Sequence, residues 1–404
     1  MPSSGPELAD VVGRYGAEFL GAYGHTLGPE QRAALRAITA CRTAALGGHV
    51  LACSTCGHRE TSYNSCRNRH CPKCQAAARA RWLEARASEL LPVPYFHVVF
   101  TLPDQLAHLA LQNKRLIYDL LFTSVWEAMR SIARDPKHLG AEIGYLAVLH
   151  TWGQTLVHHP HLHLVVPGGG LSQDGTRWVA ARPRFFLPVR VLSRRFRTVL
   201  LDGLARAFER GELSFFGDLS DLADPARFAT LASELRHIEW VVYAKPPFGS
   251  PLAVLKYLGR YTHRVAIANS RLVSIDDSQV RFRYKDYRNG NRPREMTLEA
   301  VEFLRRFLQH VLPRGFQRIR HYGYLANRCR AKKLAACRRL LGVREDGMRP
   351  LPDPDLATAP KPDAERRCPA CTIGHLEVIA VLARGCPIAS APPRVIAVEG
   401  VDSS

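Results

Sequence analysis

A strand-like segment with two histidines constrains the fold of this chain more than any other feature. The segment is His158–Val166, in which Leu162 separates His161 from His163. Side chains of a β-strand point alternately to the two faces of a sheet, so the two imidazoles share one face. Two imidazoles on a rigid strand form half of a metal site; the alternative is a pair of structural histidines with ordinary hydrogen bonds. We therefore expect a β-sheet that presents His161 and His163 together.

A second segment carries two tyrosines at helical spacing. Residues 251–264 have apolar residues at helical intervals and begin with a proline, which predicts a helix. Tyr257 and Tyr261 stand at positions i and i+4, so their phenols share one helix face and can approach the same metal-bound phosphate. The alternative is a pair of aromatic side chains that pack in the core.

A third segment completes a recognisable order of elements. Residues 95–103 read as a buried strand that ends at a proline. A strand, a histidine pair and a tyrosine helix in this order resemble the nucleases named for the motif His-hydrophobic-His, which include rolling-circle replication initiators and relaxases. From about residue 32 to residue 342, the chain more specifically resembles the insertion sequence 91 family of two-tyrosine rolling-circle transposases. The segments that carry this resemblance are Thr151–Gln154, His158–Gly170, Lys245–Gly249, Tyr257–Asn269 and His321–Arg328.

This resemblance implies a metal-dependent DNA strand transferase. It implies a transposase that nicks and rejoins single-stranded DNA at the transposon ends and acts on target DNA. The implied intermediate is a covalent 5′-phosphotyrosine, with Tyr257 and Tyr261 as the nucleophiles. The implied catalytic cation is Mg²⁺ or Mn²⁺, bound by His161 and His163, and it would act as a Lewis acid on the scissile phosphate. Nitrogen ligands suit manganese better than magnesium.

A third protein ligand to this cation is expected. Related initiators often place a carboxylate or an amide close to the histidine pair, which makes Gln154 the candidate, seven residues before His161. His150 and His159 are the alternatives. His159 has the strand parity of His161, but Pro160 interrupts the hydrogen-bond ladder between them.

The tyrosine nucleophiles need activation, because an unperturbed phenol has a pKa of about 10. Lys256 and Arg260 are neighbouring positive groups that would favour the phenolate during attack. Because one phosphoester replaces another, the joining step needs no ATP. The glycine run at 168–170 lacks the Lys-Ser/Thr of a P-loop, so we expect no nucleotide cofactor.

Two Cys-x-x-Cys pairs lie 14 residues apart in the amino-terminal part of the chain. Their spacing is that of a zinc ribbon and predicts a structural Zn²⁺ site formed by Cys53, Cys56, Cys71 and Cys74. The substitute ligands that the sequence offers are Cys66, His58 and His70. A helix with a basic side is expected over residues 75–91, and its Arg79 and Arg81 are candidate DNA-binding residues.

The other cysteines are interpreted as follows. Cys41, Cys329, Cys337 and Cys386 have no tight spacing and are expected to be ordinary thiols. Cys368 and Cys371 resemble half of a second zinc knuckle, for which Cys386 and His375 are the nearest later partners. The zinc prediction rests mainly on the amino-terminal pairs.

The charge of the chain predicts a polyanionic partner. The sequence has 404 residues, with 56 Lys and Arg against 36 Asp and Glu, and a net charge of +20. Residues 271–339 contain 18 Lys and Arg against 6 Asp and Glu, and are the expected contact surface for phosphates. Solvated helix faces are the alternative for any single arginine. Further DNA-binding candidates are Arg264, Arg281, Arg283, Lys285, Arg288 and Arg328.

The predicted fold class is α+β. A central antiparallel sheet of the His-hydrophobic-His endonuclease type is expected, flanked by helices. Four consecutive regions are expected: residues 1–90 form a helical lead and zinc-ribbon DNA-binding module, 91–270 the catalytic domain, 271–345 a basic DNA-binding extension and 346–404 a loosely ordered tail. Five aromatic residues either stack on unpaired bases or pack in the core: Trp152, Tyr284, Tyr287, Tyr322 and Tyr324.

Two other functions fit parts of this pattern. One is a plasmid relaxase or replication initiator, which the zinc ribbon and the two-tyrosine spacing disfavour. The other is a non-enzymatic zinc-dependent DNA-binding regulator with inert histidines and tyrosines. No apolar run is long enough to cross a bilayer and the amino terminus lacks a secretory pattern, so the expected location is the cytoplasm, without a membrane partner.

Overall fold

The computed structural model describes residues 5–245, 247–248, 253–254, 257, 259, 266–286, 289–290, 292–343 and 367–385; within these, the side chains of 75–81 and 84 are not described. The chain forms two compact units, and neither is a continuous segment. The first unit comprises Met1–Ala80, His263–Val311 and Asp353–Ser404. The second unit comprises Arg81–Thr262 and Leu312–Pro352.

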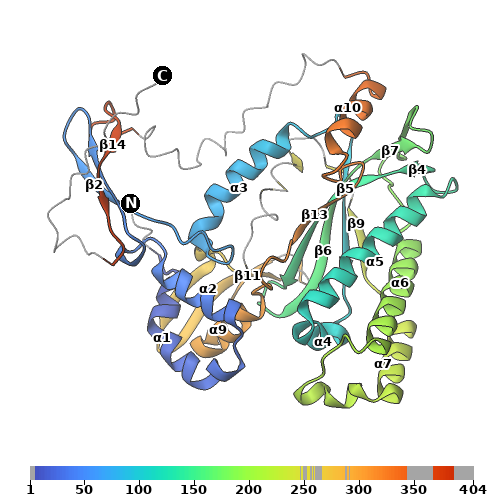
Figure 1. Ribbon diagram of the computed structural model, residues 1–404, viewed down its shortest axis with the longest axis horizontal. Helices are drawn as coiled ribbons and strands as arrows, with labels where there is room; N and C mark the ends of the chain where they lie inside the picture. Colours follow the sequence, from blue (N-terminus) through green and yellow to red (C-terminus); the bar gives the residue numbers. More distant parts are fainter. Residues whose placement is uncertain are drawn as a thin grey trace. The chain divides into compact units, whose positions relative to one another are not determined.

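A five-stranded antiparallel sheet forms the centre of the second unit (Figure 1). Its strand order is β13-β5-β6-β3-β9. The strands are β3 (Tyr95–Thr101), β5 (Gly144–Trp152), β6 (His158–Pro167), β9 (Val242–Lys245) and β13 (Ile319–Gly323). The chain thus combines helices with antiparallel sheets, and the two strands expected around residue 98 and over 158–166 are present as β3 and β6.

One face of this sheet packs on helices α5 (Lys114–Arg134) and α6 (Val189–Glu209) (Figure 1). Alternate residues of β6, Leu162 and Leu164, are fully buried in the same core as Phe122 of α5 and Phe196 of α6. Both helices are amphipathic, so each buries an apolar side against the apolar face of the sheet. The opposite side chains of the strands, including His161 and His163, therefore point to the other face.

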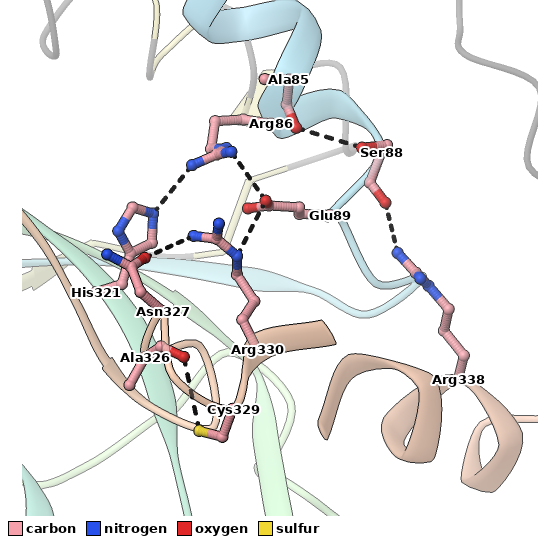
Figure 2. Close-up of polar contacts among 10 residues, drawn as sticks. All are labelled: Ala85, Arg86, Ser88, Glu89, His321, Ala326, Asn327, Cys329, Arg330 and Arg338. Carbon is pink, nitrogen blue, oxygen red and sulfur yellow. Dashed lines mark hydrogen bonds and ion pairs between the residues drawn. The ribbon is translucent and has the colours of Figure 1, made fainter. Parts of the chain in front are cut away.

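The remaining elements of the second unit lie around this core. They are α4 (Ala107–Gln112), α7 (Pro225–His237), α10 (Arg330–Leu340) and a small sheet of β4 (Ala141–Glu142), β7 (Gly169–Ser172) and β8 (Trp178–Ala180). Figure 2 shows a polar network that joins the end of helix α3 (Pro72–Ala87) and the residues just after it to β13 and α10. Glu89 forms ion pairs of 2.9 Å with Arg86 and 3.1 Å with Arg330, and Arg338 donates to the Ser88 carbonyl.

The first unit contains a helical layer and a basic three-stranded sheet. Its helices are α1 (Leu8–Tyr23), α2 (Pro29–Ala40) and α9 (Ala300–Gln309), and its strands are β10 (Leu272–Asp276), β11 (Gln279–Asp286) and β12 (Arg292–Glu299). Phe282 of β11 meets Phe303 of α9 with ring centroids 5.8 Å apart. Arg14 of α1 donates to the Ile275 carbonyl at 3.0 Å, and Gln31 of α2 to the Leu308 carbonyl at 3.0 Å.

The first unit also contains a small sheet built from the two ends of the chain. Strands β1 (Gly48–Cys53) and β2 (Arg59–Tyr63) form a hairpin, and β14 (Leu376–Leu382) pairs antiparallel with β1. The sequence predicted a loosely ordered tail from residue 346. That prediction is wrong for residues 367–385, because the main chain of β14 completes a sheet with a strand more than 300 residues earlier. The rest of the tail lies outside the described residues.

The compact units differ from the four consecutive regions predicted from the sequence. The basic segment 271–345 is divided between the units, because α9 packs with α1 and β13 pairs with β5. Packing between segments far apart in sequence leaves no local signal, so the composition of the segment could not reveal the division. Among the helices that the structure describes, none has the length and apolar character needed to cross a bilayer.

Candidate functional site

Three histidines meet on the face of the five-stranded sheet that lies away from α5 and α6. His150 of β5 is paired directly with His161 of β6, and His163 follows on the same face of β6. One ring nitrogen from each of the three lies within 4.8 Å of the others. Three imidazole nitrogens this close together can bind a single divalent cation. The expected sharing of one face by His161 and His163 is confirmed.

The hydrogen bonds of these rings determine which nitrogens can face a cation. His161 Nδ1 donates to the carbonyl of His159 at 2.7 Å, which leaves Nε2 with its lone pair. His163 Nδ1 lies 2.8 Å from His97 Nε2. Burial lowers the pKa of His161 to about 4 and that of His97 to about 3, and it also holds the pKa of His163 low. The imidazoles are therefore neutral at pH 7, the form that binds metals.

Tyr257 lies against this cluster. Its Oη is 2.5 Å from His97 Nε2 and 3.1 Å from His163 Nδ1. Its ring also contacts Phe248, with centroids 5.0 Å apart. The phenol oxygen therefore lies in the immediate surroundings of a cation bound to His163. Of the other residues predicted for the nucleophile segment, Lys256, Arg260, Tyr261 and Arg264 lie outside the described residues.

His150, one of the two alternatives for the third ligand, belongs to the histidine group. Gln154 was our first candidate for the third ligand, and it lies in the turn between β5 and β6. His159, the other alternative, is partly exposed and contacts Asp104 at 3.0 Å. Trp152 stacks on His150, with centroids 4.7 Å apart and planes 17° apart, and so restricts the orientation of that imidazole.

His97 is a site residue that the sequence interpretation missed. The segment around it was identified as a strand, but no role was assigned to its histidine. His97 pairs with Val165, which places it on the face of His163. Alternation along β3 alone places His97 on the opposite face of the sheet from its buried neighbours Phe96 and Val98. The missing information was the register between β3 and β6, which spacing along the chain does not contain.

Four cysteines of the amino-terminal segment form one compact cluster. The sulfur atoms of Cys41, Cys66, Cys71 and Cys74 lie within 4.8 Å of one another. Cys74 Sγ is 3.5 Å from both Cys41 Sγ and Cys66 Sγ. Hydrogen bonds from Cys41 and Cys71 hold the pKa of Cys74 well below its usual value, and its place in the first turn of α3 also favours a thiolate. Four thiolates in this arrangement fit a tetrahedral Zn²⁺ site.

Cys53 and Cys56 belong to a different cluster. Their sulfur atoms group with those of Cys368 and Cys371, all within 4.8 Å. The predicted site of Cys53, Cys56, Cys71 and Cys74 is therefore corrected: its two knuckles face different partners. Cys41, expected to be an ordinary thiol, and Cys66, expected only as a substitute, occupy the first cluster. The Cys-x-x-Cys spacing identified both knuckles. Which cysteines share a cluster depends on the pairing of β14 with β1, which brings Cys368 and Cys371 beside Cys53 and Cys56.

The predicted DNA-binding residues lie on several elements. Arg281, Arg283 and Lys285 are exposed on β11, whereas Val280 and Phe282 between them are buried. Arg328 is exposed and lines a cavity of about 310 Å³ in the second unit, together with Arg130, Arg134 and Lys333. The side chains of Arg79 and Arg81, and the whole of Arg288, lie outside the described residues.

Two aromatic candidates for base stacking pack against other aromatic side chains. Tyr324 is fully buried and meets Trp178 edge to face, with centroids 6.0 Å apart. Tyr322 is partly buried against the core and stacks on Trp126 and on Tyr145, at centroid distances of 5.4 and 5.1 Å. Packing, the second of the two alternatives, therefore applies to both.

Comparisons with known proteins agree with this combination of sites. Residues 144–333 match a family model described as "Putative transposase", and residues 11–102 match one described as "Transposase zinc-binding domain". A Sinorhizobium fredii protein named "Putative transposase y4qJ" is 56% identical over 94% of this chain and 96% of its own length. The "Transposase for insertion sequence element IS801" of Pseudomonas savastanoi pv. phaseolicola is 30% identical over 80% of this chain and 75% of its own length. The chain therefore belongs to the insertion sequence 91 family of rolling-circle transposases and contains that family's zinc-binding domain.

Proposed function

We propose that this transposase cuts and rejoins single-stranded DNA at the ends of its element through a covalent 5′-phosphotyrosine. The observation that carries the proposal is the position of Tyr257 Oη, 3.1 Å from a nitrogen of His163, which shares a face with His150 and His161. A nucleophilic oxygen beside a set of cation ligands is the arrangement that phosphoryl transfer requires. The sheet is then that of a His-hydrophobic-His endonuclease.

The three histidines fit a divalent cation, and nitrogen ligands suit Mn²⁺ better than Mg²⁺. When bound, this cation would draw charge from the nonbridging oxygens of the scissile phosphate. The residues of the chain have separate tasks. His161 is oriented by the carbonyl of His159, and Trp152 restricts the ring of His150. His97 holds Tyr257 by a hydrogen bond to its phenol, so the nucleophile is positioned before DNA arrives.

The proposed cutting step exchanges one phosphoester for another. The Tyr257 phenol oxygen forms a bond to phosphorus as the bond between phosphorus and the 3′ oxygen breaks. The phenol loses its proton, and the departing 3′ oxygen takes one up to become a hydroxyl. In the joining step a 3′ hydroxyl attacks the phosphotyrosine and restores the phenol, so no ATP is consumed.

Tyr261 is proposed as the second nucleophile, with Lys256 and Arg260 as positive groups that favour the phenolate. Two nucleophiles allow two covalent strands to be held and exchanged in one site, which suits strand transfer. The relaxase, replication-initiator and non-enzymatic regulator alternatives are not favoured, because two transposase models match the chain and both reported relatives are named transposases.

The DNA is proposed to contact basic residues in both units. The exposed side chains of Arg281, Arg283 and Lys285 on β11 offer positive groups on one face of a sheet. Arg328 beside its basic cavity offers a second phosphate contact. Arg79, Arg81, Arg264 and Arg288 are proposed to add to this surface on the basis of their charge.

The proposal is tested by trapping the covalent intermediate. The full chain is incubated with single-stranded oligonucleotides from the two ends of its element and Mn²⁺, then separated by denaturing electrophoresis. We expect a DNA-protein adduct that is absent with EDTA. Tyr257→Phe and Tyr261→Phe should each reduce or abolish adduct formation, because each variant lacks one nucleophilic oxygen.

The matched control is Tyr23→Phe, which removes a phenol at the end of α1 in the first unit. This variant should form the adduct at the normal rate. Adduct formation by the Tyr257→Phe/Tyr261→Phe double variant would show that the assigned nucleophiles are wrong.

A further inference from the structure

Four cysteines from the two ends of the chain form a cluster that the zinc-binding domain match does not account for. That match covers residues 11–102, which contain Cys53 and Cys56 but not Cys368 and Cys371. All four cysteines of the other cluster lie within residues 11–102 and complete a tetrahedral set by themselves. The knuckle at Cys53 therefore needs its own explanation.

The distances between the sulfur atoms fit a tetrahedral metal site and are too long for a disulfide. Cys53 Sγ lies 3.6 Å from Cys371 Sγ, and Cys56 Sγ lies 3.7 Å from Cys368 Sγ. A tetrahedral zinc site with Zn–S bonds of about 2.3 Å has sulfur atoms about 3.8 Å apart. A disulfide would need about 2.05 Å. All ten described cysteines are free thiols.

The two knuckles share one hydrogen bond, which runs from the backbone N–H two residues after the first cysteine to the sulfur of that cysteine. In the first, the backbone N–H groups of Thr55 and Cys56 donate to Cys53 Sγ at 3.4 and 3.5 Å. In the second, Ala370 N–H donates to Cys368 Sγ at 3.4 Å. Gly374 N–H also donates to Cys371 Sγ at 3.4 Å. Amide donors directed at sulfur stabilise thiolates, which are the form that binds metal.

The sheet around this cluster has little buried apolar surface. Its hydrophobic cluster consists of Leu51, Cys53, Cys368 and Leu376, and Ala380 of β14 is also buried. Two of the cluster residues are ligand candidates, so two leucines and one alanine remain as apolar core. Val378 and Val381 of β14 are more than half exposed, at 52% and 56%. A three-stranded sheet with so little buried surface normally depends on a metal or a disulfide.

We propose that Cys53, Cys56, Cys368 and Cys371 bind a second structural Zn²⁺ ion, which closes a zinc ribbon made from the amino-terminal hairpin and the carboxyl-terminal strand β14. The ion fixes the register in which Cys53 faces Leu376 and Gly48 faces Leu382. The carboxyl-terminal segment is then part of the zinc-binding module. All four ligand positions are filled by protein, so this ion is structural and takes no part in catalysis.

Zinc content per chain tests the proposal directly. The full chain, purified in reducing buffer without chelator, is expected to contain two Zn²⁺ by elemental mass spectrometry. Cys368→Ser/Cys371→Ser should contain one, and so should Cys66→Ser/Cys74→Ser, which damages the other cluster. Cys329→Ser is the matched control, because Cys329 belongs to neither cluster, and it should keep both ions. One zinc in the unmodified chain, or two in Cys368→Ser/Cys371→Ser, would overturn the proposal.

A measurement on the unmodified chain does not depend on any variant folding. Cys56 is exposed, so iodoacetamide can reach its thiol when no metal is bound. We expect Cys56, Cys368 and Cys371 to resist alkylation until a chelator removes the zinc, and then to react together. Immediate alkylation of Cys56 in the zinc-loaded chain, read by peptide mass spectrometry, would contradict a bound ion.

Discussion

His150 and His161 are paired across neighbouring strands, and this pairing assembles three ligand nitrogens at one point on the sheet. The sequence could predict which histidines lie together only when they belong to the same strand. Two residues on β6 separated by one position must share a face, so His161 and His163 could be placed together. His150 and His97 lie on β5 and β3, and their approach depends on the registers between strands. Those registers cannot be predicted from the spacing of residues along the chain.

The identity of the third ligand can be tested by metal affinity. His150→Ala should weaken Mn²⁺ binding at least about tenfold, because it removes one of three clustered nitrogens. Gln154→Ala and His159→Ala should change it much less, because these residues lie in a turn and at a partly exposed position. Isothermal titration calorimetry with Mn²⁺ measures all three. A larger loss for Gln154→Ala than for His150→Ala would restore the glutamine as the ligand.

Gly323 ends strand β13 at a close backbone contact. Its φ is +60°, and an added Cβ would meet the Ile143 carbonyl oxygen at 1.7 Å. Gly323→Ala should therefore destabilise the second unit by about 2–5 kcal/mol, since both backbone strain and a steric clash oppose it. Urea unfolding followed by circular dichroism measures this change.

The matched control is Gly342→Ala, in the same unit. Gly342 has a φ of +69° but no atom within 4 Å of an added Cβ. This variant should lose only about 1–2 kcal/mol, the cost of left-handed backbone for a residue with a side chain. Equal losses for the two variants would mean that backbone strain, and not the contact with Ile143, decides the effect.

Arg281, Arg283 and Lys285 share the exposed face of strand β11, because alternate side chains of one strand point to the same side. Arg281→Ala/Arg283→Ala/Lys285→Ala should weaken binding of single-stranded DNA and reduce the salt dependence, by about 0.7 in the slope of log K against log salt for each lost phosphate contact. Fluorescence anisotropy at several salt concentrations measures the slope.

Arg210→Ala is a control for this loss of charge. Arg210 is exposed but already forms an ion pair with Glu212 at 3.0 Å. Its removal should leave the slope unchanged. If the triple variant kept the full slope, β11 would not lie on the DNA path.

On the scale of the whole molecule, the two units should respond differently to loss of metal. The cysteine clusters lie in the first unit, whereas the second unit has a large apolar core of sheet, α5 and α6. Chelation under reducing conditions should increase amide hydrogen exchange in β1, β2 and β14, while β3, β5 and β6 stay protected. Simultaneous loss of protection in all six strands would show that the units are not independent.

The division of the chain into these units was beyond sequence interpretation. Composition marked residues 271–339 as basic, which is a property of the surface. Unit boundaries follow contacts such as those of α1 with α9, which join segments separated by almost 300 residues. The sequence could identify the Cys-x-x-Cys knuckles and the strands around residue 98 and over 158–166, but only the folded structure shows which elements they pair with.

The pairing of β1 with β14 has a consequence during translation. The ribosome makes Cys53 and Cys56 early and must add more than 300 residues before Cys368 and Cys371 emerge. Throughout that interval the hairpin has no third strand, and a chain that terminates before residue 368 never acquires one. The module can thus close only after residues 368–371 have left the ribosome, so its folding waits for a segment made more than 300 residues after its first knuckle.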